Sequence, residues 1–192
     1  MGPNGLTDSE VILMVRRGQK DAFRTIIERY WTKIHNLIRR SLSDSFLVED
    51  LCQETFLKAF DKIDQFDESR SFTPWLCKIA LNLLTEHFRK AGTKLQFLSF
   101  DGRELQGTTP CPSEKVEGKI RLDEFLNALP ISLRIVFILK HGLMMSCEDI
   151  SHVFDEPVGT IKGNLYRARE ILKTYYLRDA EILKAQEESK PR

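Results

Sequence analysis

A short helix, a tight turn and a second, basic helix follow one another near the end of this chain. A helical pattern covers residues 146–154, the turn residues 155–157 come next, and the segment VGTIKGNLYRARE begins at Val158. Between Val158 and Arg178 there are five lysines and arginines and one acid, Glu170, although the whole chain has a formal net charge of only +1. The pattern predicts a helix-turn-helix whose exposed face is cationic, which suits DNA.

The spacing of apolar residues predicts which side chains of this motif face outward. The seam between the two helices would consist of Ile150, Val153, Phe154, Val158, Ile161 and Leu165. The residues left outward, where a major groove would lie, are Thr160, Lys162, Asn164, Tyr166 and Arg167. A small helical hairpin with a solvated basic face is the alternative, because a helix-turn-helix pattern on its own is often found in segments that do not bind DNA.

The rest of the chain also has helical periodicity and no strand alternation. Apolar residues recur every three or four positions over residues 22–38 and 48–63, and again from Thr73 and Pro74, which mark a helix start, to about Lys90. A later series over residues 116–142 is broken at Pro130. Residues 93–112 lose this periodicity and gather Gly, Pro, Ser and Thr, which is typical of a linker.

These segments predict an all-α protein with two small helical domains joined by a flexible linker. The first domain takes residues 1–92, the linker 93–112, and the second domain, with its helix-turn-helix, 113–178. A charged tail takes residues 179–192, and its partial apolar stripe leaves open whether the chain after Tyr176 forms a further helix. A chain of 192 residues that is 42% hydrophobic is long and apolar enough to bury such cores.

Composition argues against several classes of function. The longest purely apolar run, residues 135–139, is far shorter than the roughly 20 residues that span a bilayer, so we expect a soluble, cytoplasmic protein. The four cysteines form no CxxC pair, and the four histidines occur singly, so neither a metal site, a cofactor nor a catalytic set is indicated. Cys52, Cys77 and Cys147 are expected to be buried, while Cys111 in the linker keeps a redox role open.

Two parts of the chain resemble one known family. The segment LPISLRIVFILKHGLMMSCEDISHVFDEPVGTIKGNLYRARE is similar to the carboxy-terminal domain of the extracytoplasmic-function (group 4) sigma factors of bacterial RNA polymerase. The first predicted domain resembles the same family independently. It contains DAFRTIIERYWTKIHNLI, VEDLCQETFLKAFDKIDQF and SFTPWLCKIALNLLTEHFRK, which resemble, in order, the helices of that family's promoter-melting domain. The likeness covers most of the chain, with the linker in the expected place.

The resemblance implies a function. A sigma factor is a promoter-specificity subunit, not an enzyme, that binds core RNA polymerase, recognises the minus-10 and minus-35 promoter elements and helps to open the duplex. Residues 1–92 would bind the polymerase and melt the promoter, and residues 113–178 would read the minus-35 element. Family membership also implies control by an anti-sigma factor, often within a stress or envelope response, and no direct insertion into the membrane.

The resemblance assigns roles to residues of the first domain. The polymerase-docking face maps onto Asp50, Gln53 and Glu54, for which a plain solvated helix face is the alternative. The minus-10 contacts map onto Phe66 as a wall for a flipped base, Asn82 at its pocket, and Lys78 and Arg89 near phosphates. Phe66 is equally consistent with a core residue under a loop, and Trp75 is assigned to the core.

In the second domain the minus-35 contacts map onto Thr160, Lys162, Gly163, Tyr166 and Arg167. Two positions depart from the family pattern, because Gly163 stands where Ser is usual and Asn164 where Arg is usual. A hydrogen-bond donor and a charge are therefore missing, and glycine inside a helix costs roughly 1 kcal/mol relative to alanine. The promoter sequence that is read is expected to differ accordingly.

Two other functions compete with a sigma factor. A stand-alone helix-turn-helix regulator would bind duplex DNA without polymerase, usually at a two-fold operator. A decoy for an anti-sigma factor would keep the packing faces but lose promoter-reading side chains, and the presence of Asn82, Lys162 and Arg167 argues against it. The apolar linker residues Leu95, Phe97, Leu98 and Phe100 would either thread through the polymerase or cover the first domain.

Overall fold

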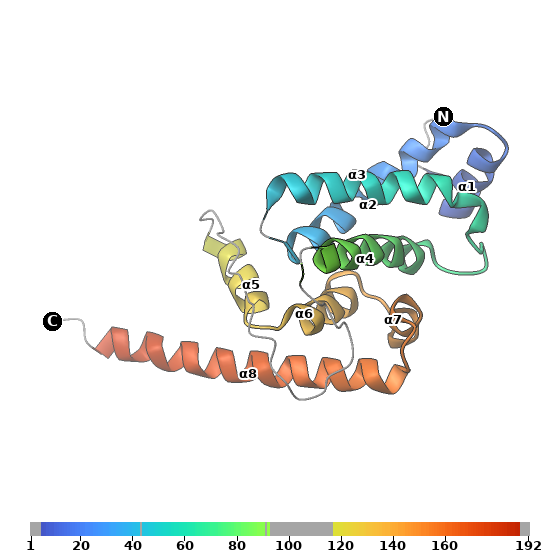
Figure 1. Cartoon of the computed structure of the whole chain (residues 1–192). Coiled ribbons are helices and arrows are strands. Elements are labelled where there is room, and N and C mark those ends of the chain that lie inside the picture. The colour runs from blue at the N-terminus through green and yellow to red at the C-terminus, as the bar shows by residue number, and fades with distance from the viewer. Residues whose placement is uncertain (1–4, 43, 91, 93–116, 189–192) are drawn as a thin grey trace. The chain divides into compact units, whose positions relative to one another are not determined.

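The computed structural model describes residues 5–42, 44–90, 92 and 117–188, and every regular element in these ranges is helical (Figure 1). The chain divides into two compact units, one containing α1 to α4 and the other containing α5, α6, α8 and most of α7. The prediction of an all-α protein with two helical domains is therefore confirmed for the part of the chain that is described. The predicted linker, with its apolar residues and Cys111, lies outside the described residues.

The first unit is built on three long helices. Its elements are α1 (Asp8–Arg16), a 3₁₀ turn (Lys20–Ala22), α2 (Phe23–Arg39), α3 (Ser45–Asp61), a second 3₁₀ turn (Ile63–Gln65) and α4 (Phe72–Lys90). Fully buried side chains of α2, among them Ile26, Ile34 and Leu37, form the core together with Leu76 and Leu84 of α4. The amphipathic spacing of the sequence thus places the polar faces of α3 and α4 in solvent.

Helix α1 was not anticipated from the sequence, although its start signal is present there. The backbone N–H of Glu10 donates to Oγ1 of Thr7 at 3.3 Å, and the backbone N–H of Thr7 donates to Oε2 of Glu10 at 2.6 Å, which is a capping box. Val11, Ile12 and Val15 bury the inner face of the helix. Asp8 accepts a hydrogen bond from Arg29 Nη1 at 2.8 Å, which ties α1 to α2.

The second unit surrounds a small core of its own. Its elements are α5 (Glu117–Asn127), α6 (Ile131–Phe137), a π-helical turn (Ile138–Gly142), α7 (Cys147–Phe154) and α8 (Val158–Glu188). Leu129 and Leu133 pack against Ala168 and Leu172 of α8 in a buried cluster. Arg134 is buried beside it, and its Nη2 donates to the carbonyl of Leu129 at 3.0 Å.

The ends of two helices add detail to the sequence analysis. Helix α8 continues to Glu188, so it includes most of the charged segment 179–192, whose helicity the sequence left open. The reason is that residues 179–188 (DAEILKAQEE) contain no Gly or Pro and consist mainly of strong helix formers. Helix α4 begins at Phe72, one residue before the predicted cap Thr73, and Pro74 is accommodated in the first turn, where its missing N–H is harmless.

Candidate nucleic-acid and polymerase interfaces

The predicted helix-turn-helix is formed by α7 and α8. The backbone N–H of Asp149 donates to Oγ of Ser146 at 2.9 Å, and the backbone N–H of Ser146 donates to Oδ2 of Asp149 at 3.2 Å, so the predicted capping pair at the start of α7 is confirmed. The helix ends at Phe154 and is followed by Asp155, whose φ of 54° lies in the left-handed region. Aspartate tolerates this conformation better than most residues, and it turns the chain into α8.

Most residues of the predicted seam are removed from solvent. Ile150, Val153, Ile161 and Leu165 are buried, and Phe154 and Val158 are half-buried. On the outer side of α8, Lys162, Tyr166 and Arg167 are exposed, with 64% of the Tyr166 side chain in solvent, while Thr160 and Gly163 are half-buried. Three of the five minus-35 candidates thus present exposed side chains on the first turns of α8.

The expectation that Asn164 faces outward is wrong, because only 3% of this residue is exposed. Asn164 follows Ile161 by three residues and precedes Ala168 by four, so it shares the inner face of α8 with both. Gly163 is different: a Cβ added there would meet no atom within 4 Å. No contact in the second unit therefore requires glycine at this position.

Three of the four minus-10 candidates lie together on α4. Asn82 and Arg89 are exposed and Lys78 is half-buried, and their spacing of four and seven residues places them on one face of the helix. Phe66 does not join them as an exposed wall. Only 5% of it is exposed, and its ring packs edge-on against Phe72 and Trp75, with centroids 5.2 Å and 5.3 Å away. The geometry corresponds to the alternative in which Phe66 is a core residue under the loop. With no base bound, packing in the core removes the apolar ring from water, which is favourable.

The loop between α3 and α4 is held by a residue that sequence reasoning missed. Nη2 of Arg16 donates to the carbonyls of Ile63 at 2.8 Å and Phe66 at 2.6 Å, and Nη1 of Arg16 pairs with Glu68 at 2.5 Å. The backbone of the loop is thereby fixed while its polar side chains stay in solvent. No sequence signal links Arg16 to this loop, which lies about 50 positions further along the chain.

The predicted polymerase face lies on α3. Asp50, Gln53 and Glu54 are all exposed, and Glu54 also pairs with Lys58 at 3.0 Å. Two large apolar side chains share this face, because Phe46 precedes Asp50 by four residues and Leu57 follows Gln53 by four. Phe46 is 86% exposed and Leu57 65% exposed. An acidic stripe flanked by exposed apolar residues is typical of a protein-binding surface.

The cysteines of the described segments show no sign of reactivity. Burial raises the pKa of the Cys52 and Cys77 thiols to about 12, so neither forms a thiolate near neutral pH. Cys147 is half-buried at the start of α7. None of the helices described is both long and apolar enough to cross a membrane.

Comparison with known proteins matches each of the two units to a region of sigma factors. The model of Sigma-70 region 2 matches residues 26–93, and that of Sigma-70 region 4 matches residues 119–172. The ECF RNA polymerase sigma factor SigW of Bacillus subtilis is 32% identical over 84% of this chain and 92% of its own length. The ECF RNA polymerase sigma-E factor of Haemophilus influenzae is 29% identical over 88% of this chain and 94% of its own.

Solved structures agree in fold. The sigma factor RpoE of Bartonella quintana, in a complex with the anti-sigma factor NepR, matches with a TM-score of 0.62 at 25% identity, over 79% of this chain and 94% of that one. CnrH, in a complex with the cytosolic domain of CnrY, matches with a TM-score of 0.66 at 23% identity, over 90% of this chain and 97% of that one, and supports the fold alone. Since each unit matches its own sigma region and a relative is 32% identical over nearly its whole length, the chain belongs to the extracytoplasmic-function sigma factors of RNA polymerase.

Proposed function

We infer that this sigma factor binds core RNA polymerase, directs it to the minus-10 and minus-35 elements of a promoter, and helps to open the duplex. One observation carries this inference: the two promoter-reading regions of the family match the two helical units in the order that the family requires. Opening of the promoter duplex needs no other source of free energy from this chain, because binding of an extruded base offsets the cost of unstacking it.

The second unit reads the minus-35 element through the start of α8. Lys162, Tyr166 and Arg167 are exposed on its outer side, with Thr160 and Gly163 beside them. A recognition helix makes its base contacts from its first turns, and lysine or arginine there reaches guanine edges or phosphates. Asn164 is buried and takes no part in reading DNA, so specificity depends on the remaining side chains.

The first unit captures the minus-10 element with α4 and the loop before it. Asn82 supplies amide hydrogen bonds to a flipped base, and Lys78 and Arg89 on the same face neutralise phosphates. The ring of Phe66 packs on Phe72 beneath the loop, so it is not available to stack on a base. Arg16 fixes the loop backbone by donating to the carbonyl of Phe66. The base pocket is therefore lined by the polar loop and α4.

The exposed face of α3 docks on the polymerase and is the surface that an anti-sigma factor covers. Asp50, Gln53 and Glu54 provide acidic and amide contacts, and Phe46 and Leu57 add apolar area. A partner that covers this face blocks polymerase binding by competition. The structures of relatives in complexes with anti-sigma factors support such control, and a cytoplasmic location follows from binding to RNA polymerase.

A multi-round run-off transcription assay tests the function. Core RNA polymerase is given a fragmented bacterial genomic template, with or without this protein, and new discrete transcripts are expected only when it is present. The double variant Lys162→Gln and Arg167→Gln removes those transcripts by weakening minus-35 contacts, since each specific base contact is worth about 1–3 kcal/mol. The matched control is Arg17→Gln with Lys20→Gln, which removes two exposed cations outside both family matches.

Two outcomes would overturn the inference. No new transcripts with a folded protein and an active core would exclude a sigma role on that template. Tight, two-fold-symmetric duplex binding without polymerase would instead support a stand-alone regulator.

A further inference from the structure

A second group of positive charges lies on the second unit, outside the recognition positions. The π-helical turn Ile138–Gly142 carries Lys140 and His141, and Arg169 of α8 lies close enough to His141 for its charge to act on the imidazole. Partial burial of the ring lowers the pKa of His141, and the positive charges of Arg169 and Lys140 lower it further. The imidazole also packs on Phe137, with ring centroids 4.5 Å apart. Cations from two elements thus converge on one place.

The group continues along α8. Arg169 and Lys173 are exposed and follow Lys162 by seven and eleven residues, which keeps all three on one flank of the helix. Among the described residues neither Arg169 nor Lys173 has a carboxylate within ion-pair distance, whereas Arg24, Lys58 and Lys90 each pair with an acid one turn away.

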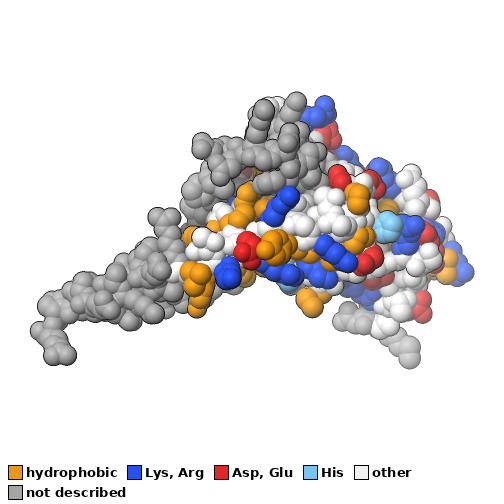
Figure 2. All heavy atoms as spheres, turned by 90° about the horizontal axis from the view of Figure 1, so that it is seen from below, with side chains coloured by type: hydrophobic (Ala, Val, Ile, Leu, Met, Phe, Trp, Pro, Cys, Tyr) orange, Lys and Arg blue, Asp and Glu red, His pale blue; other side chains and the backbone are white. Residues whose placement is uncertain are grey.

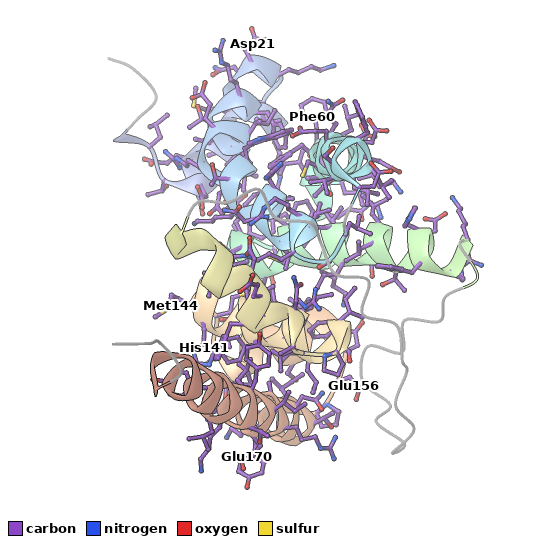
Figure 3. All side chains as sticks on the ribbon, turned by 90° about the vertical axis from the view of Figure 1, so that its left-hand side faces the viewer. Asp21, Phe60, His141, Met144, Glu156 and Glu170 are labelled. Atoms are coloured by element: carbon purple, nitrogen blue, oxygen red, sulfur yellow. The ribbon has the colours of Figure 1, made fainter. Side chains whose placement is uncertain are left out.

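The figures show how this flank is exposed. Lysine and arginine side chains follow one another along α8 when the molecule is seen from below (Figure 2). Glu170, the acid within this stretch, projects from α8 away from His141 (Figure 3). The side chains of Lys140, His141, Arg169 and Lys173 are called here the cationic flank, and among the described residues Glu170 forms no ion pair with any of them.

We propose that the cationic flank binds the phosphates of one DNA strand at the edge of the major groove, and that His141 takes up a proton when the DNA is bound. The proposal rests on the proposed function, because it requires the start of α8 to lie in the groove. The cationic flank would add contacts with phosphates to the base contacts made by the first turns of α8. Proton uptake by His141 would make the affinity for the promoter depend on pH.

The geometry suits a strand of DNA. With a rise of 1.5 Å per residue, Arg169 lies about 10 Å and Lys173 about 16 Å along the helix from Lys162. Each strand of DNA carries one phosphate about every 3.4 Å along the axis of the duplex, so the row from Lys162 to Lys173 is long enough to face more than one phosphate. A recognition helix enters the groove by its first turns, and its later turns pass the sugar–phosphate backbone.

The π-helical turn gives the flank its second element. Single π-helical turns are rare and occur frequently at functional sites. Here the turn carries Lys140 next to His141, which lies near Arg169 of α8, and Nζ of Lys140 donates to the carbonyl of Met145 at 3.1 Å. A phosphate next to these cations would favour the imidazolium form of His141, because the anion reverses the local excess of positive charge.

A salt titration tests the contact with phosphates. The full-length chain is titrated with a fluorescent 30-base-pair duplex of arbitrary sequence between about 50 and 200 mM KCl, and anisotropy gives the affinity. The double variant Arg169→Gln and Lys173→Gln is expected to lower the slope of log K against log [salt] by about 2, since each phosphate contact contributes about 0.9. The control, Arg17→Gln with Lys20→Gln, changes net charge equally and is expected to leave the slope unchanged.

The two proposals fail differently in this experiment. If Lys162→Gln with Arg167→Gln lowers the slope but the flank variant does not, the flank does not touch DNA and this inference is overturned while the proposed function stands. If neither pair changes the slope, α8 is not the DNA-binding element, and both are overturned.

A pH series tests the role of His141. Between pH 7.8 and pH 5.8 the unmodified chain is expected to gain about three- to tenfold more affinity for the duplex than the His141→Gln variant, since only the former binds a proton with the DNA. His152→Gln, which removes an exposed histidine of α7, is the control and keeps the pH dependence. Equal pH dependence in the unmodified chain and His141→Gln would exclude proton-linked binding at His141.

Discussion

Gly163 lies among the DNA-reading positions of α8 although nothing in the fold demands a glycine there. A Cβ would meet no atom within 4 Å. We therefore predict that Gly163→Ala raises the free energy of unfolding of the second unit by about 0.5–1 kcal/mol, the usual helix penalty of glycine. Urea unfolding followed by circular dichroism measures the change.

Gly18 provides the contrasting substitution. Its φ of +91° lies in a region that side chains rarely adopt, so Gly18→Ala is expected to destabilise the first unit even though space for the Cβ is open. A loss of stability in Gly163→Ala similar to that in Gly18→Ala would contradict the prediction for Gly163.

Tyr30 makes the stability of the first unit sensitive to alkaline pH. Burial, together with the hydrogen bond that its hydroxyl donates to Asp8, raises the pKa of Tyr30 to about 12. In the unfolded chain the phenol ionises near pH 10, so between pH 10 and 12 the unfolded state loses a proton that the folded state keeps. The contribution of Tyr30 is present below pH 10 and is lost as the pH rises toward 12, by about 2 kcal/mol.

The comparison with Tyr30→Phe isolates this effect from other alkaline titrations. Urea unfolding at several pH values should show the stability difference between the two proteins shrinking above pH 10, while absorbance at 295 nm follows phenolate formation. A difference that stays constant up to pH 12 would show that Tyr30 ionises normally in the folded state.

Periodicity in the sequence predicted which face of a helix most residues occupy, and this prediction was wrong or undecided where contacts with other elements determine burial. Asn164 looks like an outward polar residue, yet it shares the inner face of α8 with Ile161 and Ala168. Phe66 lies in a loop, where an exposed ring was plausible, but Phe72 and Trp75 surround it in three dimensions. Neither neighbour relation can be read from the local sequence alone.

At the scale of the helices, amphipathic spacing identified the long elements, and shorter ones escaped it. α1 was missed because it spans only nine residues, although Thr7 and Glu10 give its capping box. The π-helical turn and the clamp of Arg16 on the loop before α4 depend on tertiary contacts. Whether the charged segment after residue 178 is helical could not be decided from its partial apolar stripe, and in the structure α8 continues to Glu188 because these residues are good helix formers.

The exposed face of α3 yields a prediction about polymerase binding. Phe46 is 86% exposed, so Phe46→Ser removes no core contact and should leave the unfolding free energy within about 0.5 kcal/mol. If the face docks on the polymerase, the same change weakens binding to core RNA polymerase about tenfold, since a buried aromatic anchor is worth more than 1 kcal/mol. Fluorescence titration of the labelled chain with core polymerase measures it.

Matched variants make that result specific. Leu13→Ser, at a partly exposed leucine of α1, should keep normal affinity, and Asp50→Ala should lose affinity through the polar part of the face. Unchanged binding in Phe46→Ser together with a loss in Asp50→Ala would confine the interface to the acidic residues. Unchanged binding in both would remove α3 from the polymerase interface.

At the scale of the whole molecule, the two units have separate cores. The first is centred on α2 and α4, and the second on the cluster of Leu129, Leu133, Ala168 and Leu172. The residues of each core come from one side of the break in periodicity, which is why the division into two helical domains could be predicted from that break. We therefore expect residues 1–92 and 113–192 to fold as separate fragments, each with cooperative loss of helical circular dichroism on heating.

The last prediction concerns what the connection between the units contributes. Each unit makes few contacts with DNA, and joining them turns the second binding event into an intramolecular one at an effective concentration near the millimolar range. Supplied as two fragments at micromolar concentration, the halves should therefore support at least about 100-fold less run-off transcription than the intact chain. Raising the concentration of the second fragment should restore part of the signal. Equal activity of the fragments and the intact chain would mean that each unit binds the polymerase–promoter complex tightly alone, and that the connection contributes no affinity.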